Sequence, residues 1–321
     1  MTVEKPLWSP SREQLEKSPL RTFMSWCGQR YGSPQSSPDD FHRWSVEAPE
    51  EFWSAIWTFC GVKGEPGAQV LLHGDEMLAA RFFPEARLNF AENLLSRQGQ
   101  EDAIVFWGED KVRGRWSWDR LHAEVSRMQQ AMQGAGIRQG DRIAAMMPNV
   151  PETVALMLAA ASLGAVWSSC SPDFGEQGVL DRFGQIEPSL FFACDGYWYN
   201  GKLQDVSDKI RAVASALGVP VVIVPYAGDA PALAASLADG RTLPDFIAPF
   251  QSREIEFLPL PFSHPLYILF SSGTTGVPKC IVHSAGGTLL QHLKEHRLHC
   301  GIEPGEKLFY FTTCGWMMWN W

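Results

Sequence analysis

The feature that most constrains the fold is an alternation of short apolar runs with amphipathic segments between residues 103 and 224. The apolar runs have the length and composition of buried strands, predicted at Ala103–Trp107, Arg142–Met147, Ala165–Cys170, Leu190–Cys194 and Val219–Val224. The segments between them predict helices after Ser117, over Glu152–Leu163, near Gly178–Gln185 and over Val206–Leu217. Strands that alternate with helices are joined by right-handed crossovers and form sheets covered on both faces. The predicted fold class is therefore α/β, with parallel-rich sheets and flanking helices.

Residues 1–60 have a different pattern and predict a separate helical region. Ser11 is a candidate N-cap for a helix that continues to about Tyr31. Pro49 begins a second helix, in which apolar residues continue through Phe59. We therefore divide the chain into a helical extension, residues 1–60, and a larger α/β region, residues 61–321.

The charge and the cysteines of the chain limit the classes of function. A net charge of −9 over 321 residues disfavours nucleic acid and anionic membranes as partners. The seven cysteines are scattered without a CxxC pair, and the N-terminus has no apolar signal segment. No run approaches the ~20 apolar residues that a membrane-spanning helix needs. The prediction is a cytoplasmic protein that acts on small molecules; its oligomeric state is not predicted.

The segment with the most chemical information follows a short predicted strand at Tyr267–Phe270. It runs from Ser271 to Lys279 with the sequence Ser-Ser-Gly-Thr-Thr-Gly-Val-Pro-Lys. Glycines let backbone amides approach a ligand, and successive amides with hydroxyls form a concavity that binds anions. The GxxxxGK[ST] spacing of P-loop nucleotide-binding proteins is absent from it. We predict that this segment, the phosphate loop, binds a triphosphate.

The phosphate loop resembles the signature of the adenylate-forming superfamily, which includes acyl-CoA synthetases, luciferase and the adenylation domains of peptide synthetases. The resemblance implies ATP, Mg²⁺ and coenzyme A as ligands, and a carboxylate that attacks the α-phosphate to give an acyl-adenylate. It implies Lys279 and Thr274 as catalytic residues that stabilise the transferring phosphoryl group. The residues implied to hold the ATP phosphates are Ser271, Ser272, Gly273, Thr274, Thr275, Gly276 and Lys279.

Other stretches resemble one branch of that superfamily, the acetoacetyl-CoA synthetases, from about Trp44 onward. They are Phe83–Leu95, Trp167–Phe174, Arg182–Pro188 and the run from Lys279 to Trp319. The resemblance implies acetoacetate as the acid and places Trp316, Met317 and Met318 in the wall of the acyl pocket, where adaptable methionines suit a keto-acyl chain. Ordinary core packing is the alternative role of these three residues. Acetate, propionate or another short acid is the alternative substrate.

Three further features have competing explanations. Lys202 lies where acetyl-CoA synthetases contact coenzyme A, so the resemblance implies such a contact, although a surface lysine is commonly only solvated. His292, His296 and His299 have the helical spacing of zinc ligands but lack the HExxH pattern, so no metal site is predicted. Cys280 adjoins Lys279, which favours a lowered thiol pKa, but packing is the role that we expect for it.

The resemblance also implies segments that would follow Trp321. They are the adenine-contacting segment, a glutamate that binds Mg²⁺, a ribose-binding aspartate and a mobile C-terminal domain with a catalytic lysine. We therefore expect the chain to be an N-terminal fragment, with residues 61–321 an incomplete AMP-binding domain that is inactive in ligation by itself. A non-catalytic nucleotide-binding protein is the alternative from a different functional class.

Overall fold

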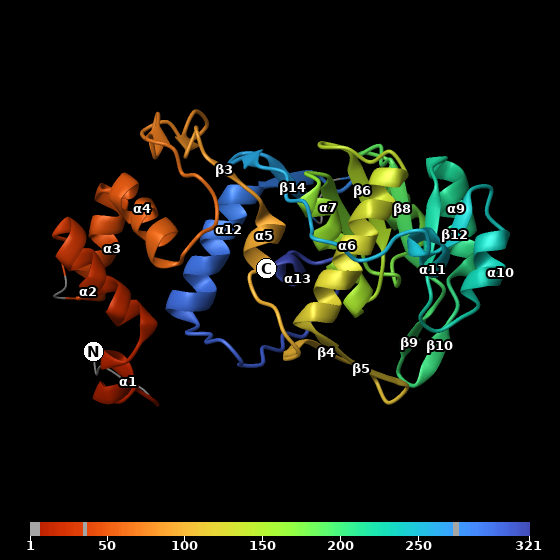
Figure 1. The fold of residues 1–321 in the computed structure, drawn as a ribbon, viewed down its shortest axis with the longest axis horizontal. Helices are drawn as coiled ribbons and strands as arrows, with labels where there is room; N and C mark the ends of the chain where they lie inside the picture. Colours follow the sequence, from red (N-terminus) through yellow and green to blue (C-terminus); the bar gives the residue numbers. More distant parts are fainter. Residues whose placement is uncertain (1–6, 35–36, 272–275) are drawn as a thin grey trace. The chain divides into compact units, whose positions relative to one another are not determined.

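The computed structural model describes residues 7–34, 37–271 and 276–321, and the chain divides into two compact units (Figure 1). The first unit consists of residues 1–86 and 287–309, and the second of residues 87–286 and 310–321. Four residues of the phosphate loop, Ser272, Gly273, Thr274 and Thr275, lie outside the described residues. Within the described ranges, no helix has the length and hydropathy that crossing a bilayer requires.

The first unit consists of short helices whose aromatic side chains pack together. The ring of Phe23 is fully buried, with its centroid 5.0 Å from that of Phe59 and 5.8 Å from that of Phe41. Strands β1 (Leu71–Leu72) and β2 (Arg81–Phe82) pair antiparallel. The helices are α1 (Arg12–Glu16), α2 (Pro19–Tyr31), α3 (Pro38–Glu47), α4 (Pro49–Phe59), most of α12 (Ala285–Leu293) and the π-helix η1 (Lys294–His299).

The start of this unit both confirms and corrects the sequence prediction. Ser11 caps α1 through a reciprocal pair of hydrogen bonds with Gln14, as expected. The prediction of a single helix from Ser11 to Tyr31 is wrong, because the first helix ends at Glu16 and a second begins at Pro19. Proline has no backbone donor to continue a helix but suits its first position, and Ser18 supplies the new cap.

The second unit is built on a seven-stranded sheet with the order β12-β11-β8-β6-β7-β14-β15. Neighbouring strands pair in parallel, except that β14 and β15 are antiparallel. Every residue of β7, β8 and β11 is buried, which explains their continuous apolar runs and confirms the predicted α/β class. The strands are β6 (Arg142–Met146), β7 (Val166–Cys170), β8 (Leu190–Cys194), β11 (Val221–Val224), β12 (Gly240–Thr242), β14 (Pro265–Phe270) and β15 (Cys280–Ser284).

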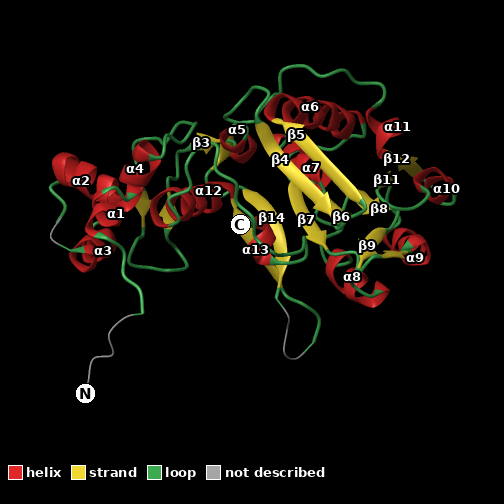
Figure 2. Ribbon diagram, turned by 90° about the horizontal axis from the view of Figure 1, so that it is seen from below, coloured by secondary structure: helices red, strands yellow, loops and turns green. Residues whose placement is uncertain are grey.

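Helices cover both faces of this sheet. Figure 2 shows α6 and α7 on one side and α8 and α9 on the other, as right-handed crossovers require. The predicted cap at Ser117 is confirmed, since its Oγ accepts a hydrogen bond from the Arg120 amide at 3.2 Å. The helices are α5 (Phe90–Leu94), α6 (Trp118–Gly134), α7 (Pro151–Ser162), α8 (Glu176–Phe183), α9 (Ser207–Leu217), α10 (Ala230–Ala235), α11 (Leu243–Ile247) and α13 (Met317–Asn320).

Three small antiparallel pairs lie outside the main sheet. The strand predicted at residues 103–107 is β4 (Asp102–Gly108), but it pairs with β5 (Val112–Ser117) and does not join the parallel sheet. The exposure of Val105 and Trp107 is consistent with a position outside the buried parallel sheet. The other pairs are β9 (Tyr197–Tyr199) with β10 (Lys202–Gln204), and β3 (Arg87–Leu88) with β13 (Leu260–Pro261).

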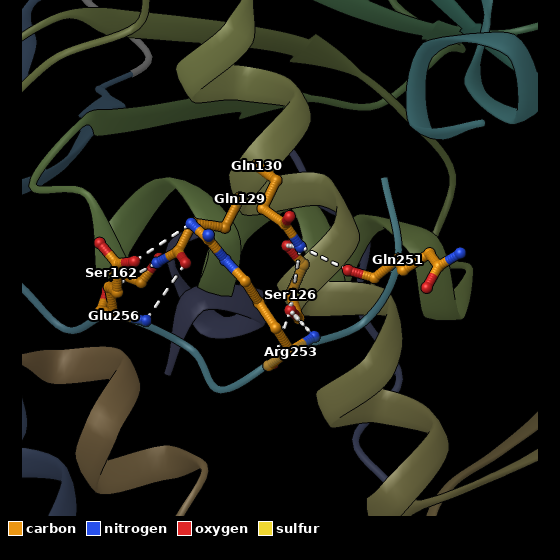
Figure 3. Close-up of polar contacts among 7 residues, drawn as sticks. All are labelled: Ser126, Gln129, Gln130, Ser162, Gln251, Arg253 and Glu256. Atoms are coloured by element: carbon orange, nitrogen blue, oxygen red, sulfur yellow. Dashed lines mark hydrogen bonds and ion pairs between the residues drawn. The ribbon is translucent and has the colours of Figure 1, made fainter. Parts of the chain in front are cut away.

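An irregular segment, residues 251–258, runs along α6, and we call it the strap (Figure 3). Side chains of α6 bind its backbone. Ser126 Oγ donates to the Arg253 carbonyl at 2.7 Å and accepts from the Arg253 amide at 2.9 Å. Gln129 Nε2 donates to the Glu256 carbonyl at 2.6 Å and to Ser162 Oγ at 2.7 Å. The strap is therefore held by buried side chains although it forms no helix or strand.

Candidate functional site

The carboxyl ends of the parallel strands meet at one edge of the sheet, where ligands of open α/β folds bind. Two neighbours at this edge, β7 and β14, continue in opposite directions, since β7 leads back across β6 to β8 and β14 leads to β15. The two strands are tied together by Ser168 Oγ, which donates to the Ile268 carbonyl at 2.9 Å. This reversal of strand order is where a ligand site is expected, and the phosphate loop begins there.

The phosphate loop joins β14 to β15 as an antiparallel hairpin. Phe270 pairs with Cys280, and the Ser271 amide donates to the Lys279 carbonyl at 3.1 Å, so the two legs of the loop are joined at its base. Ser271 is half-buried, whereas Gly276 and Lys279 are exposed. The Lys279 ammonium has no ion pair with any described residue. The described part of the loop therefore presents a cation to solvent at the sheet edge.

Cys280 differs from both expectations for it. Its side chain is exposed, so core packing is not its role. The partial burial of the thiol raises its pKa above the ordinary value, so the neighbouring Lys279 does not produce a reactive thiolate. The Cys280 sulfur lies 3.8 Å from Gln185 Oε1.

The candidate acyl-pocket residues lie at the same sheet edge. Their segment is held by Ser169 Oγ of β7, which donates to the Cys314 carbonyl at 2.8 Å, and by Trp319 Nε1, which donates to Asn149 Oδ1 at 2.9 Å. Trp316 is 63% exposed and Met317 49%, which is inconsistent with ordinary core packing. Met318 is half-buried. Their role in an acyl pocket stays a prediction.

Lys202 is separated from the phosphate loop. It is exposed on the β9–β10 hairpin, which follows β8, and β8 is three strand positions from β14, roughly 14 Å. The neighbouring Gly201 amide donates to Glu109 Oε2 at 2.7 Å. A contact of Lys202 with coenzyme A also stays a prediction.

The three histidines belong to the first unit. His292 is buried and His299 exposed, and the ring centroids of His292 and His296 are 5.8 Å apart. His296 and His299 lie in η1, whose winding differs from the α-helical spacing on which the zinc comparison was based. Within the described ranges, no group of three His, Cys, Asp or Glu side chains is placed to hold a metal.

Two polar side chains at the carboxyl edge were not identified from the sequence as functional. Arg182 lies in the last turn of α8 and Gln185 directly after its C-cap, and they contact the two legs of the phosphate loop. Their stretch, Arg182–Pro188, carried part of the family resemblance without an assigned role. Only the pairing of β7 with β14, strands about 100 residues apart in sequence, brings α8 beside the loop.

Comparison with known proteins gives two matching family models. The one described as "AMP-binding enzyme" matches residues 91–319, and the one described as "Acetyl-coenzyme A synthetase N-terminus" matches residues 39–94. Together they cover residues 39–319 of the chain.

Similar individual proteins carry names from one class of enzyme. An acetoacetyl-coenzyme A synthetase of Rhizobium meliloti is 67% identical over 100% of this chain and 49% of its own length. A malonamoyl-CoA synthetase of Penicillium aethiopicum is 38% identical over 99% of this chain and 46% of its own. The solved acetoacetyl-CoA synthetase from Streptomyces lividans matches with a TM-score of 0.91 at 36% identity, over 98% of this chain and 49% of that one. The chain spans about half the length of the curated relatives that it matches.

Proposed function

Because the chain belongs to the AMP-binding enzyme family, we propose that it supplies the polyphosphate-binding part of an ATP-dependent acetoacetate–CoA ligase. One observation carries the proposal: the phosphate loop leaves the carboxyl end of β14 beside β7, with Lys279 exposed at its far leg. A lysine ammonium and loop amides are suited to the β- and γ-phosphates of ATP. The overall charge of −9 makes such a local cation important for attracting an anionic ligand.

The proposed reaction has two steps. A carboxylate oxygen of acetoacetate attacks the α-phosphorus of MgATP, and the bond from that phosphorus to the bridging oxygen breaks, releasing pyrophosphate. The thiol of coenzyme A then attacks the acyl carbon of the adenylate, losing its proton, and AMP leaves. Lys279 and Thr274 would stabilise the charge that develops on the departing pyrophosphate, an effect realised mainly in the transition state.

The choice of acid is supported by the names of the relatives. Acetoacetate and malonamate have the same heavy-atom skeleton, a methyl group in one replacing an amino group in the other. Relatives with both names match this chain, which favours a pocket for a four-atom chain with a 3-carbonyl group. The adaptable side chains of Met317 and Met318 would line it. Acetate and propionate are the alternative acids.

The remaining assignments belong to the same proposal. Residues 1–60 would be the extension of acyl-CoA synthetases, and residues 61–321 part of the adenylation domain. The two family matches meet at residues 91–94, so they support two successive parts with a later boundary than residue 60. Lys202 would contact coenzyme A. A cytoplasmic setting is supported by the seven cysteines, all of which are free thiols.

A direct test uses the chain and a chimera that joins it to the part of the Rhizobium meliloti relative that it does not match. AMP formation is measured with acetoacetate, malonamate, acetate and propionate, and the relative itself serves as the positive control. We expect the chimera to form AMP with acetoacetate and the chain alone to bind MgATP without turnover. If the chimera is inactive with every acid while the relative is active, the proposal that the chain is part of an acetoacetate–CoA ligase is contradicted. MgATP binding in that case supports the second candidate, a non-catalytic nucleotide-binding protein.

A further inference from the structure

The end of α8 contacts both legs of the phosphate loop. On the first leg, the Arg182 guanidinium carbon lies 5.9 Å from the ring centroid of Phe270, the last residue of β14. On the second leg, Gln185 Nε2 donates to the Pro278 carbonyl at 2.8 Å, and its Oε1 lies 3.8 Å from the Cys280 sulfur. The last turn of α8 and the turn that follows it thus contact the loop where it leaves the sheet and where it returns.

Arg182 is held in place by its own surroundings. Its guanidinium stacks on the ring of Phe174 at 4.6 Å, and Nη1 donates to the Gly178 carbonyl at 2.6 Å within α8. A planar guanidinium between two aromatic rings has a defined position, which a lysine ammonium would not reproduce. The contact with Phe270 is therefore a fixed one.

The same stack reaches the candidate acyl segment. Gly315, directly before Trp316, passes so close to β7 that a Cβ would lie 3.1 Å from the Ser171 amide nitrogen and 3.2 Å from Phe174 Cζ. Phe174 therefore lies close to Gly315 of the acyl segment and also stacks with Arg182. The acyl segment and Arg182, which contacts the first leg of the phosphate loop, thus share one aromatic neighbour.

We propose that Arg182 and Gln185, the α8 clamp, are positioning residues that set the separation of the two legs of the phosphate loop and so its affinity for the β- and γ-phosphates. This inference rests on the proposed function, since it takes ATP as the ligand of the loop. It gives a role to Arg182–Pro188 and Trp167–Phe174, two of the stretches whose family resemblance had no assigned function.

The test replaces Gln185 by methionine, which keeps the side-chain length but removes the donor. The matched control is Gln177→Met on the first turn of the same helix, where an exposed glutamine bonds only to Asp181 among the described residues. MgATP and AMP are titrated by calorimetry into each chain. Gln185→Met also removes a bond to the Asp181 carbonyl within the helix end, which does not reach the loop. Loss of the neutral bond to the Pro278 carbonyl predicts about three- to tenfold weaker MgATP binding. AMP affinity and the control should not change, because AMP lacks the phosphates that the loop would hold.

A second readout does not depend on ATP. The amide of Ser271 bonds to Lys279 across the base of the loop, and its hydrogen exchange should become faster in Gln185→Met and stay unchanged in Gln177→Met. Wild-type exchange and MgATP affinity in Gln185→Met would overturn the clamp, as would an equal loss of ATP and AMP affinity. If the wild-type chain fails to bind MgATP, the proposed function fails, and the exchange of Ser271 still decides on the clamp.

Discussion

The strap and the phosphate loop are both irregular segments next to helices of the second unit, yet their backbones are satisfied differently. The strap is bound at Gln251, Arg253 and Glu256 by side chains of α6, with bonds of 2.6–3.2 Å. In the described part of the loop, bonds join its base and reach Pro278, while Gly276 and Lys279 face solvent. The difference separates a segment that stabilises the fold from one whose polar groups remain for a ligand.

The largest expected effect tests the strap. Replacing Gln129 by alanine removes three hydrogen bonds, one to Ser162 Oγ and two to the backbone of Glu256, from a fully buried position. We expect a loss of about 3 kcal/mol in the free energy of unfolding, measured by urea denaturation. The matched control is Gln133→Ala on the exposed side of α6, which should change stability little. Equal stability of the two variants would mean that the strap is not held by these bonds.

The next effect tests the loop. Lys279→Ala should weaken MgATP binding by about 10- to 100-fold, because a charge-assisted contact to phosphate is lost. The free energy of unfolding should stay within about 0.5 kcal/mol of the wild type, since the side chain is exposed. Calorimetric titration and urea denaturation of the same protein measure both. If Lys279→Ala lowers stability but binds MgATP normally, Lys279 stabilises the fold and does not bind the ligand.

A smaller effect refines the description of the strap. Ser126→Ala removes one hydroxyl that bonds to both backbone groups of Arg253. The expected loss is about 1 kcal/mol of unfolding free energy, with MgATP affinity unchanged. The exchange of the Arg253 amide should become faster at the same time. Unchanged exchange would show that other contacts hold this part of the strap.

The smallest effect is a difference in pH dependence. Burial lowers the pKa of His283 on β15 below its ordinary value, so the imidazole is neutral in the folded chain near neutral pH. Its contribution to stability is complete above the unfolded pKa, about 6.5, and is lost as the pH falls through the lower folded pKa. Between about pH 7.5 and 5.5, amides of the β14–β15 hairpin should lose protection. The strap is held by the uncharged side chains of Ser126, Gln129 and Gln130, so its amides should keep their protection over the same pH range. Equal losses of protection in the hairpin and the strap would contradict the prediction.

The sequence predicts where most strands of the sheet lie better than it predicts which strands pair with one another. The strands β6, β7, β8 and β11 follow from continuous apolar runs, because burial on both faces leaves a clear signal. The short strand β12 was missed, since Gly-Arg-Thr has no strand pattern and pairing with β11 decides its conformation. The strand β4 was found but assigned to the wrong sheet, because periodicity does not identify a partner.

The candidate site shows the same limit. The phosphate loop was identified because its chemistry is contiguous in the sequence, whereas the α8 clamp depends on residues 182–185 meeting residues 270–280 through the order of the strands. The expected roles of Ser272, Gly273, Thr274 and Thr275 stay predictions that fall outside the described residues. Local motifs are readable from sequence, and the contacts that position them are not.

The measurement that tests the central claim most directly is an amide NMR titration of the chain with MgATP. If the loop binds polyphosphate, resonances of Ser271, Gly276, Lys279 and Cys280 should shift and saturate together, while those of Arg253 and Glu256 in the strap stay unchanged. AMP alone should shift the loop amides far less. Saturable binding of MgATP that leaves all four loop amides unshifted would contradict the claim.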